Sequence, residues 1–354
     1  MKKHWSQRIR DMIPYVPGEQ PRDRQFIKLN TNENPYPPSP KALEALRAAA
    51  GDSLRLYPDP ECTELRAAIA AAHGLSPEQV FPGNGSDEVL AFCFQAFFDP
   101  DRPVRFADIT YTFYAVYASY FGLTPELVPL AEDFTLPVAD LLAPGCGGVV
   151  LANPNAPTGL AVKLADIRRI LEAHRDQVVL VDEAYIDFGG ASADVLVPEY
   201  DNLVVVRTLS KGHALAGLRV GYALAQPDLI AALRCVRDSI NSYTVDRAAQ
   251  AAAAASLRDA AYFQERTAQV VRTRQRTALA LRDMGFAVTD SQANFLFVRH
   301  PQVPAKTLLD GLRERGILVR WFDRPRIRDY LRITVGTDGE MDALTAALKE
   351  LTEV

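Results

Sequence analysis

Short apolar runs alternate with amphipathic stretches along the first two thirds of the chain, between about Arg55 and Tyr243. Several runs are apolar at every position, as expected when helices cover both faces of a parallel sheet. The alternation predicts an open, mostly parallel α/β sheet with helices on both faces. The expected strands are 104–106, 126–130, 148–152, 178–182, 203–207 and 219–225, and the expected helices are 86–98, 113–121, 163–174 and 227–239.

The pattern changes after Val245. One long helix over about 246–284 is expected, followed by a mixture of strands and helices: strands 294–300, 317–320 and 330–336, a helix over 304–316, and a last helix from Asp338. This grouping is typical of a smaller α+β domain. We therefore expect an N-terminal arm and the start of the small domain at 1–45, a large α/β domain at 46–245, and a connecting helix with the small domain at 246–354.

Composition excludes several classes of function. The 354 residues carry a net charge of −5 and contain no basic block, so we expect no nucleic-acid partner. No stretch approaches the roughly 20 apolar residues of a membrane span, and the first residues lack the apolar core of a signal peptide, which favours a cytoplasmic protein without a membrane partner. The cysteines and histidines lack metal-ligand spacing, so no metal site is expected.

Four polar clusters lie beside the ends of the predicted strands: "GNGSDE" (83–88), "NPNAPTG" (153–159), "DEAY" (182–185) and "TLSK" (208–211). Taken singly, each has a structural explanation. Ser86 or Asp87 could cap a helix, and Lys211 could be a solvated loop residue. Ligands of open α/β sheets bind at the carboxyl ends of the strands. The convergence of all four clusters on this edge therefore favours a ligand site.

The residue types in these clusters suit pyridoxal phosphate. A lysine in apolar surroundings near other cations has a depressed pKa and forms imines, which is the property required of Lys211. A carboxylate such as Asp182 would keep the pyridine nitrogen protonated, so that the ring can accept electrons. Backbone N–H groups at a helix start, a hydroxyl and an arginine bind phosphate, and here they would come from Gly85, Ser86, Asp87, Ser210 and Arg219.

The sequence resembles the fold-type-I pyridoxal-phosphate aminotransferases, and within them the histidinol-phosphate branch. The stretches that carry the resemblance run in order from Asn30 to Thr337: "LNTNENPYPPSP", "YPDP", "GNGSDE", "ITYTFY", "NPNAPTG", "VDEAYIDF", "TLSKGHALAGLRVGY" and "YLRITVGT". The lysine followed by "AGLRVGY" marks the broad family. The first, sixth and last stretches together favour the histidinol-phosphate branch.

The resemblance implies a role for each matching residue around the cofactor. Lys211 would carry the cofactor and move the substrate proton, Asp182 would pair with the pyridine nitrogen, and Tyr185 would hydrogen-bond the cofactor's 3′-oxygen. Tyr111 would stack on the ring. The phosphate would be held by Gly85, Ser86, Asp87, Ser210 and Arg219 with Thr208, and by Tyr57 of the neighbouring subunit of a homodimer.

The resemblance also implies the substrates, histidinol phosphate and glutamate or 2-oxoglutarate. Arg332 would bind the α-carboxylate of glutamate, and Arg320 would help to receive the phosphate of histidinol phosphate. Tyr15, Asn32 and Tyr243 are further candidates for the wall of the substrate pocket.

The chain departs from the family pattern at Ala156. The usual residue immediately before "PTG" is an asparagine that hydrogen-bonds the cofactor's 3′-oxygen. Either Asn155 or Asn153 takes its place here, or Tyr185 makes this contact alone. The loss of one hydrogen bond, about 1 kcal/mol, would not abolish cofactor binding.

Other functions fit much of the same pattern. An aromatic-amino-acid aminotransferase or a threonine-phosphate decarboxylase would share the lysine, the aspartate and the phosphate-binding residues. An aminotransferase-like fold can also serve as the ligand-sensing half of a transcription regulator, but a DNA-binding domain would then be needed before the short N-terminal arm. A cofactor-free relative would have no reason to hold Lys211, Asp182, Tyr185 and Arg219 together.

Overall fold

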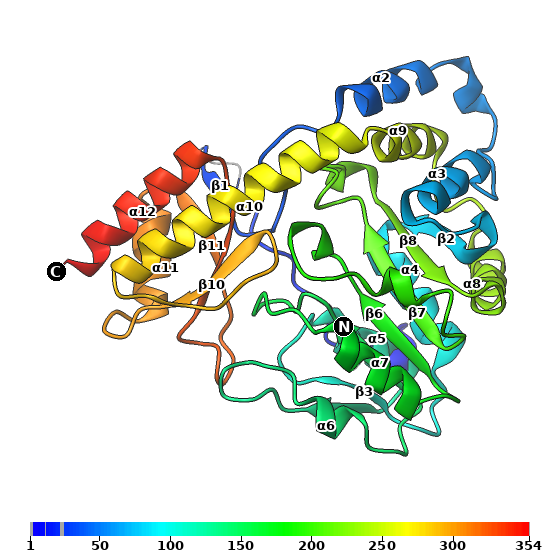
Figure 1. The fold of residues 1–354 in the computed structure, drawn as a ribbon, viewed down its shortest axis with the longest axis horizontal. Helices are drawn as coiled ribbons and strands as arrows, with labels where there is room; N and C mark the ends of the chain where they lie inside the picture. The colour runs from blue at the N-terminus through cyan, green and yellow to red at the C-terminus, as the bar shows by residue number, and fades with distance from the viewer. Residues whose placement is uncertain (1–2, 11, 22–24, 354) are drawn as a thin grey trace.

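Two β-sheets organise the chain, and they lie in different halves of the molecule (Figure 1). The computed structural model describes residues 3–10, 12–21 and 25–353. The larger sheet has seven strands in the order β2-β8-β7-β6-β5-β3-β4, of which β3 to β7 run parallel, whereas β8 is antiparallel to both of its neighbours. Its strands are β2 (Val80–Asn84), β3 (Val104–Ala107), β4 (Pro125–Val128), β5 (Gly148–Ala152), β6 (Val178–Asp182), β7 (Leu203–Thr208) and β8 (Val220–Ala225).

Helices cover both faces of the large sheet, because successive side chains of a strand point to opposite faces. In β6, Val179 and Val181 belong to one buried apolar cluster, whereas Leu180 between them belongs to another. The first cluster includes residues of α3 (Thr63–His73), α7 (Leu164–Ala173) and α9 (Arg247–Arg258), and the second includes residues of α4 (Gly85–Phe97), α5 (Phe113–Phe121) and α8 (Pro227–Ile240). The predicted open α/β sheet is therefore confirmed.

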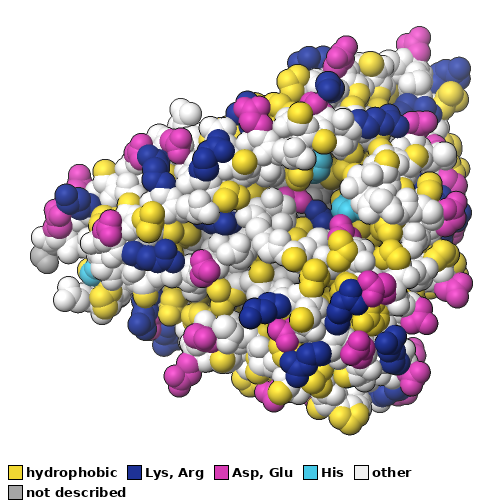
Figure 2. Space-filling view, in the orientation of Figure 1, with side chains coloured by type: hydrophobic (Ala, Val, Ile, Leu, Met, Phe, Trp, Pro, Cys, Tyr) yellow, Lys and Arg dark blue, Asp and Glu magenta, His cyan; other side chains and the backbone are white. Residues whose placement is uncertain are grey.

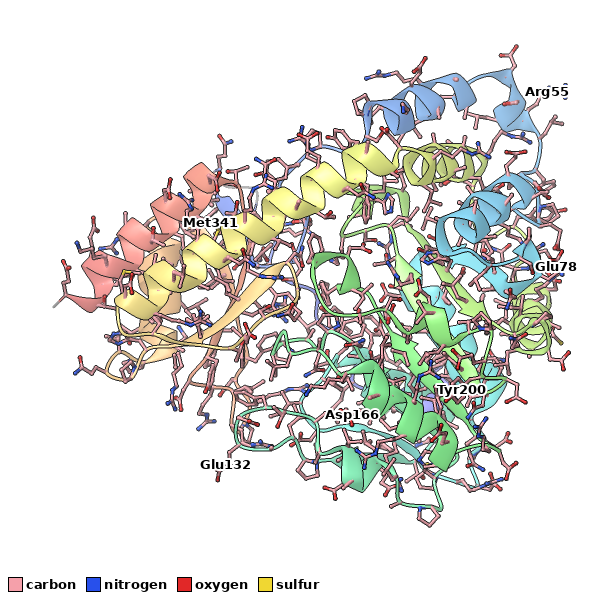
Figure 3. All side chains as sticks on the ribbon, in the orientation of Figure 1. Arg55, Glu78, Glu132, Asp166, Tyr200 and Met341 are labelled. Atoms are coloured by element: carbon pink, nitrogen blue, oxygen red, sulfur yellow. The ribbon has the colours of Figure 1, made fainter. Side chains whose placement is uncertain are left out.

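The smaller sheet has five strands in the order β1-β11-β12-β10-β9. They are β1 (Ile27–Leu29), β9 (Ala287–Val288), β10 (Phe295–Arg299), β11 (Ile317–Trp321) and β12 (Leu331–Thr334). Residues of α10 (Ala260–Asp283), α11 (Ala305–Glu314) and α12 (Asp338–Thr352) pack with it around a core that contains Met341, labelled in Figure 3. This confirms the predicted smaller α+β part of the fold.

The prediction of a single long helix over 246–284 is wrong in one respect. This segment forms two helices, α9 and α10, which are separated at Asp259. Asp259 has non-helical backbone angles, and its carboxylate accepts hydrogen bonds from Ser39 Oγ (2.6 Å) and Lys41 Nζ (2.9 Å). Those two residues begin α2 (Pro40–Ala49), which packs beside α9. The break lets α9 stay on the large-sheet core while α10, yellow in Figure 1, crosses to the small sheet.

Three strands were missed in the sequence: β9, which has only two residues, and β1 and β2, each for a different reason. β2 contains Pro82 and Gly83, which argue against a central strand, but β2 is an edge strand, where proline is tolerated. β1 is only three residues long, and it lies in a region expected to be irregular. Its parallel pairing with β11 is a tertiary contact that three residues cannot signal. The short helices α1 (Gln7–Arg10) and α6 (Val138–Leu141) complete the α-helices of the described chain.

Among the described residues, no helix is both long enough and apolar enough to cross a membrane.

Candidate active site

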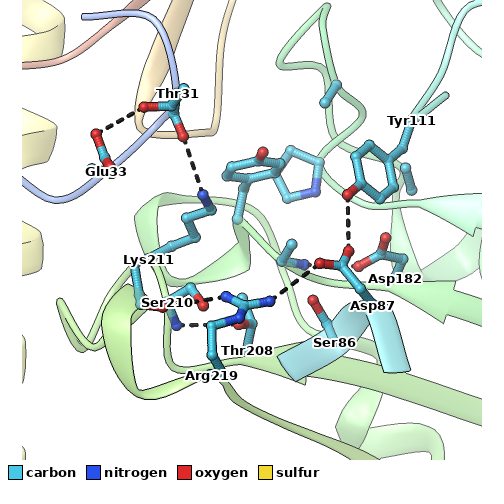
Figure 4. Close-up of a pocket in the computed structure, with 16 residues that line it drawn as sticks. Thr31, Glu33, Ser86, Asp87, Tyr111, Asp182, Thr208, Ser210, Lys211 and Arg219 are labelled. Atoms are coloured by element: carbon cyan, nitrogen blue, oxygen red, sulfur yellow. Dashed lines mark hydrogen bonds and ion pairs between the residues drawn. The ribbon is translucent and has the colours of Figure 1, made fainter. Parts of the chain in front are cut away.

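A cavity of about 290 Å³ lies at the carboxyl ends of the central strands of the large sheet. The molecule is hollowed between its two halves on the face drawn in Figure 2. Nine of the residues singled out from the sequence line this cavity, which brings the predicted clusters together (Figure 4): Ser86, Asp87, Tyr111, Asp182, Tyr185, Thr208, Ser210, Lys211 and Arg219.

Lys211 follows β7 and reaches into the cavity from the side opposite the start of α4 (Figure 4). Its Nζ donates a hydrogen bond to the backbone oxygen of Thr31 at 3.3 Å and lies 5.8 Å from the centre of the Tyr185 ring. Burial, and then the positive charge of Arg332, lower the pKa of Lys211 to about 8. A substantial fraction of the amine is therefore neutral and nucleophilic near neutral pH.

Asp182 is the last residue of β6 and is buried at the floor of the cavity. Its carboxylate accepts hydrogen bonds from the hydroxyl of Tyr114 at 2.7 Å and from the backbone N–H of Ala184 at 3.2 Å. Burial raises the pKa of Asp182 to about 6, and the Tyr114 hydrogen bond opposes that rise. A cationic N–H group placed beside this carboxylate would stabilise its ionised form further.

The start of α4 and the end of the loop before β8 form an anion-binding cradle. The first backbone N–H groups of a helix have no partner within the helix and attract anions. Gly85 has φ +81°, a conformation that residues with a Cβ atom rarely adopt, and a Cβ atom here would lie 2.6 Å from Nη2 of Arg219, so that this side chain would have to shift. Arg219 itself adopts a left-handed conformation (φ 54°) and forms an ion pair with Asp87 at 3.2 Å. Thr208 and Ser210 add hydroxyl groups to the same wall.

Tyr111 forms part of the boundary between this cavity and a second one of about 250 Å³. Its hydroxyl donates to the Asp87 carboxylate at 2.9 Å, which fixes the ring over the cradle. Tyr15 lines the second cavity and packs against Phe113, with ring centres 4.4 Å apart. Because Tyr111 and Ala156 line both cavities, the two cavities adjoin at these residues.

Arg332 and Arg320, both predicted from the sequence, line the second cavity. Arg332 is held between the rings of Phe295 and Phe322, and it donates to the backbone oxygen of Asn30 at 3.1 Å. Its Nε atom is buried and has no hydrogen-bond partner among the described residues. A buried donor without a partner is costly, so this guanidinium is suited to bind an anionic ligand.

Arg320 donates to the backbone oxygen of Val16 in the N-terminal arm at 3.3 Å. Two more arginines line the same cavity, and the sequence analysis missed both, although the stretch "RWFDRPRIRDYLR" is dense in arginine. Arg326 forms an ion pair with Asp108 at 3.0 Å. Arg324 lines the cavity together with Arg320.

Apart from Gly85, four predicted residues line neither the first nor the second cavity. Asn155 is turned away from the first cavity, because its amide bonds Thr110 Oγ1 (2.8 Å), the backbone oxygen of Ile109 (2.9 Å) and Thr158 Oγ1 (3.0 Å). Asn32 is 1% exposed and does not line the cavity. Its amide donates a hydrogen bond to the hydroxyl of Tyr185, which does. The others, Tyr57 and Tyr243, are 78% and 41% exposed and stack on each other at 4.6 Å on the surface.

The structure adds residues that the sequence analysis did not single out. Tyr114 lies three positions after Tyr111, on the buried side of α5, and its spacing in "ITYTFY" was the available signal. Thr31 and Glu33 line the cavity from the N-terminal arm. The carboxylate of Glu33 pairs with Lys28 at 2.7 Å, and these contacts, with Lys211 nearby, hold the pKa of Glu33 below its usual range.

Comparison with known proteins identifies the family. The family model for aminotransferase class I and II matches residues 24–348. Histidinol-phosphate aminotransferase 2 of Thiobacillus denitrificans is 56% identical over 99% of this chain and 98% of that protein, and the histidinol-phosphate aminotransferase of Clostridium acetobutylicum is 50% identical over 99% of both. The crystal structure of the Sinorhizobium meliloti histidinol-phosphate aminotransferase in complex with pyridoxal-5′-phosphate superposes with a TM-score of 0.88, at 29% identity over 99% of this chain and 98% of that one. The chain therefore belongs to the class I and II aminotransferase family.

Proposed function

We propose that the protein is a pyridoxal-phosphate-dependent aminotransferase that exchanges the amino group between histidinol phosphate and 2-oxoglutarate in histidine biosynthesis. The observation that carries the proposal is the pair of joined cavities: one combines Lys211, Asp182 and an anion cradle, and the other presents Arg320 and Arg332. The names of the relatives at 50–56% identity support the same activity.

The residues of the first cavity fit pyridoxal phosphate. The phosphate would lie against the start of α4 and beside Arg219, whose guanidinium packs directly on Gly85. The pyridine nitrogen would face Asp182 and the 3′-oxygen would face Tyr185. When bound, this cofactor supplies an electron-accepting ring next to the carbon whose proton is removed.

The protein's own groups would then handle charge and protons. Lys211 Nζ, with a pKa near 8, can take a proton from the substrate carbon and return it nearby, because its amine is enclosed but not fixed by strong ion pairs. Asp182, when ionised, would hold a proton on the ring nitrogen, and the surrounding apolar walls would strengthen that pairing. Tyr114 keeps the carboxylate oriented for this contact.

The second cavity would distinguish substrates by their anionic ends. The guanidinium of Arg332 has an unpaired buried Nε and can form a two-point contact with a carboxylate. Arg320, nearer the N-terminal arm, would receive a phosphate. Two substrates that end in different oxyanions can therefore use the same wall in turn.

We also propose a cytoplasmic homodimer in which Tyr57 reaches the neighbouring site. Within its own chain, the side chain of Tyr57 is exposed and contacts neither cavity. Leu54, Leu56 and Ile240 are also apolar and more than half exposed. Mixing the inactive variants Lys211→Ala and Tyr57→Ala should restore activity, since a mixed dimer contains one site with both native residues. No recovery on mixing would contradict the shared site.

The substrate is tested with purified protein and added pyridoxal phosphate. The visible absorbance of the lysine-bound cofactor should fall faster with histidinol phosphate than with phenylalanine, and 2-oxoglutarate should be required for turnover. Faster loss with phenylalanine would favour an aromatic-amino-acid aminotransferase. Release of CO₂ from a phosphorylated amino acid without any 2-oxo acid would favour the decarboxylase.

A further inference from the structure

Tyr185 receives a hydrogen bond from a residue that does not line the cavity. Nδ2 of Asn32 donates to the Tyr185 hydroxyl at 3.0 Å, and this is the one hydrogen bond of that hydroxyl within the described residues. A phenol has a single proton to donate. Because Asn32 approaches as a donor, the proton of Tyr185 remains available for an acceptor inside the cavity.

The direction of the Asn32 amide is set by its other contacts. Its Oδ1 accepts from the hydroxyl of Thr334 at 3.0 Å, and that same hydroxyl accepts from the backbone N–H of Asn32 at 2.9 Å. Its backbone oxygen accepts from Nδ2 of Asn294 at 3.0 Å. With Oδ1 held by Thr334, only the amide N–H₂ group can face Tyr185.

The backbone of Asn32 is also specialised for this position. Asn32 has φ 56°, in the left-handed region that asparagine tolerates better than most residues with a Cβ atom. Thr334 ends β12 and Asn294 precedes β10, so Asn32 is anchored on the small sheet, whereas Tyr185 follows β6 of the large sheet. The contact therefore joins the two halves of the molecule at the cavity.

The polar environment beside Tyr185 is otherwise sparse. Ala156 lines the cavity and packs in the same apolar cluster as Phe295 and Tyr185, so this position offers no polar side chain. Asn155 cannot substitute, because its amide is committed to Thr110, Ile109 and Thr158. Asn153 is fully buried and does not line the cavity, although its Nδ2 atom has no hydrogen-bond partner among the described residues. The hydroxyl of Tyr185 is therefore the side-chain donor that lines this wall, which makes its orientation important.

We infer that Asn32 is a positioning residue that aims the proton of Tyr185 at the 3′-oxygen of the bound cofactor, an inference that rests on the proposed function. By donating to the phenol oxygen, Asn32 also makes the phenol a stronger donor, because hydrogen bonds in a chain polarise one another. A stronger donor stabilises negative charge on the cofactor oxygen, and so lowers the proton affinity of the nitrogen that joins the cofactor to Lys211.

The test is a pH titration of the visible absorbance of the lysine-bound cofactor in the holoenzyme. Asn32→Gly removes the amide and keeps a residue that accepts positive φ without strain. Asn32→Asp keeps the shape and the Thr334 contact but offers a carboxylate that would accept a hydrogen bond from the Tyr185 hydroxyl, turning its proton away from the cofactor. We expect the proton affinity of the chromophore to rise about threefold to tenfold in Asn32→Gly, and by more in Asn32→Asp.

Tyr185→Phe should raise the same proton affinity, and adding Asn32→Gly to it should have no further effect. The matched control is Asn202→Ala, which removes another buried asparagine whose amide bonds the backbone oxygens of Leu171 and His174, on the large-sheet side of the molecule. It should lower stability without moving the titration. The affinity of each cofactor-free variant for pyridoxal phosphate provides a second readout: it should fall in Asn32→Gly, Asn32→Asp and Tyr185→Phe, but not in Asn202→Ala.

Two results would overturn the inference: a wild-type titration in both Asn32 variants, or a shift in Asn32→Gly that persists in the Tyr185→Phe background. Failure of the proposed function is distinct, because it is read from the wild-type protein: either no visible absorbance appears with pyridoxal phosphate, or histidinol phosphate and 2-oxoglutarate do not exchange the amino group. If the wild-type chromophore is normal and the titrations of the Asn32 variants are unshifted, only the positioning role of Asn32 is refuted.

Discussion

Tyr114→Phe is the most informative perturbation of the site, since it removes one oxygen atom from a fully buried ring. That oxygen donates to the Asp182 carboxylate at 2.7 Å, and the only other donor described for this carboxylate is the backbone N–H of Ala184 at 3.2 Å. A hydrogen bond to a charged group contributes about 1.5–3 kcal/mol. At 1.36 kcal/mol for each tenfold change, its loss should increase the proton affinity of Asp182 by ~10-fold to ~100-fold.

The pKa of Asp182 is already raised to about 6 by burial, so the variant should hold this group largely neutral at pH 7 in the cofactor-free protein. A neutral acid cannot hold a proton on the cofactor ring nitrogen by ion pairing. The acid limb of the pH profile for the glutamate half-reaction should therefore move to higher pH, with activity recovering as the pH rises and Asp182 ionises.

The assay is stopped-flow absorbance of the lysine-bound cofactor with glutamate between pH 6 and 9. Tyr117→Phe is the matched control: it removes a buried hydroxyl from the same helix, but one that donates to the backbone oxygen of Asp87 at 2.8 Å rather than to Asp182. It should leave the acid limb in place. A Tyr114→Phe profile that is lowered equally at every pH, or that coincides with the wild type, would refute the reasoning.

The remaining predictions concern the lysine, the cradle and the core. Arg332→Gln removes a charge that lowers the pKa of Lys211, so capture of pyridoxal phosphate by the cofactor-free protein should need a higher pH than the wild-type midpoint near 8; an unmoved midpoint in absorbance-monitored binding would speak against the charge effect. Lys211→Ala should retain the cofactor but not turn over, and near-normal transamination would exclude Lys211 as the essential amine. Gly85→Ala places a Cβ atom 2.6 Å from Arg219 at φ +81°, which costs about 1–2 kcal/mol in backbone strain alone and should weaken cofactor retention by roughly tenfold in equilibrium dialysis. Met341→Ala in the small-sheet core should lower the free energy of unfolding by about 2–5 kcal/mol in urea denaturation without altering the cofactor titration, and a loss below 1 kcal/mol would mean that the core closes around the deletion.

Local chemistry was predictable wherever the chain itself carries the signal. Lys211 after an apolar strand, Asp182 at the end of another and Gly85 at a helix start all lie at the sheet edge that strand polarity assigns to ligands. Asn155 shows the limit of this reasoning. It is a polar residue in the right loop, but its amide is used to hold that loop together, and sequence position does not reveal which way an amide points.

The pattern of apolar positions determined the large sheet, because strands buried on both faces must be apolar at nearly every residue. The same pattern could not place β1 or β2, whose partners β11 and β8 lie far away in the chain. Nor could it locate the break at Asp259, since the groups that stabilise it, Ser39 and Lys41, belong to another helix.

The sequence alone therefore determined the fold class, the chemistry of the lysine and aspartate, and the family resemblance. Only the tertiary structure decided which groups meet. Tyr114 reaches Asp182 across 68 positions and Asn32 reaches Tyr185 across 153, so neither pair leaves a local trace. Hydrogen bonds depend on distance and direction within a few tenths of an ångström, and these are properties of the packed chain rather than of the order of its residues.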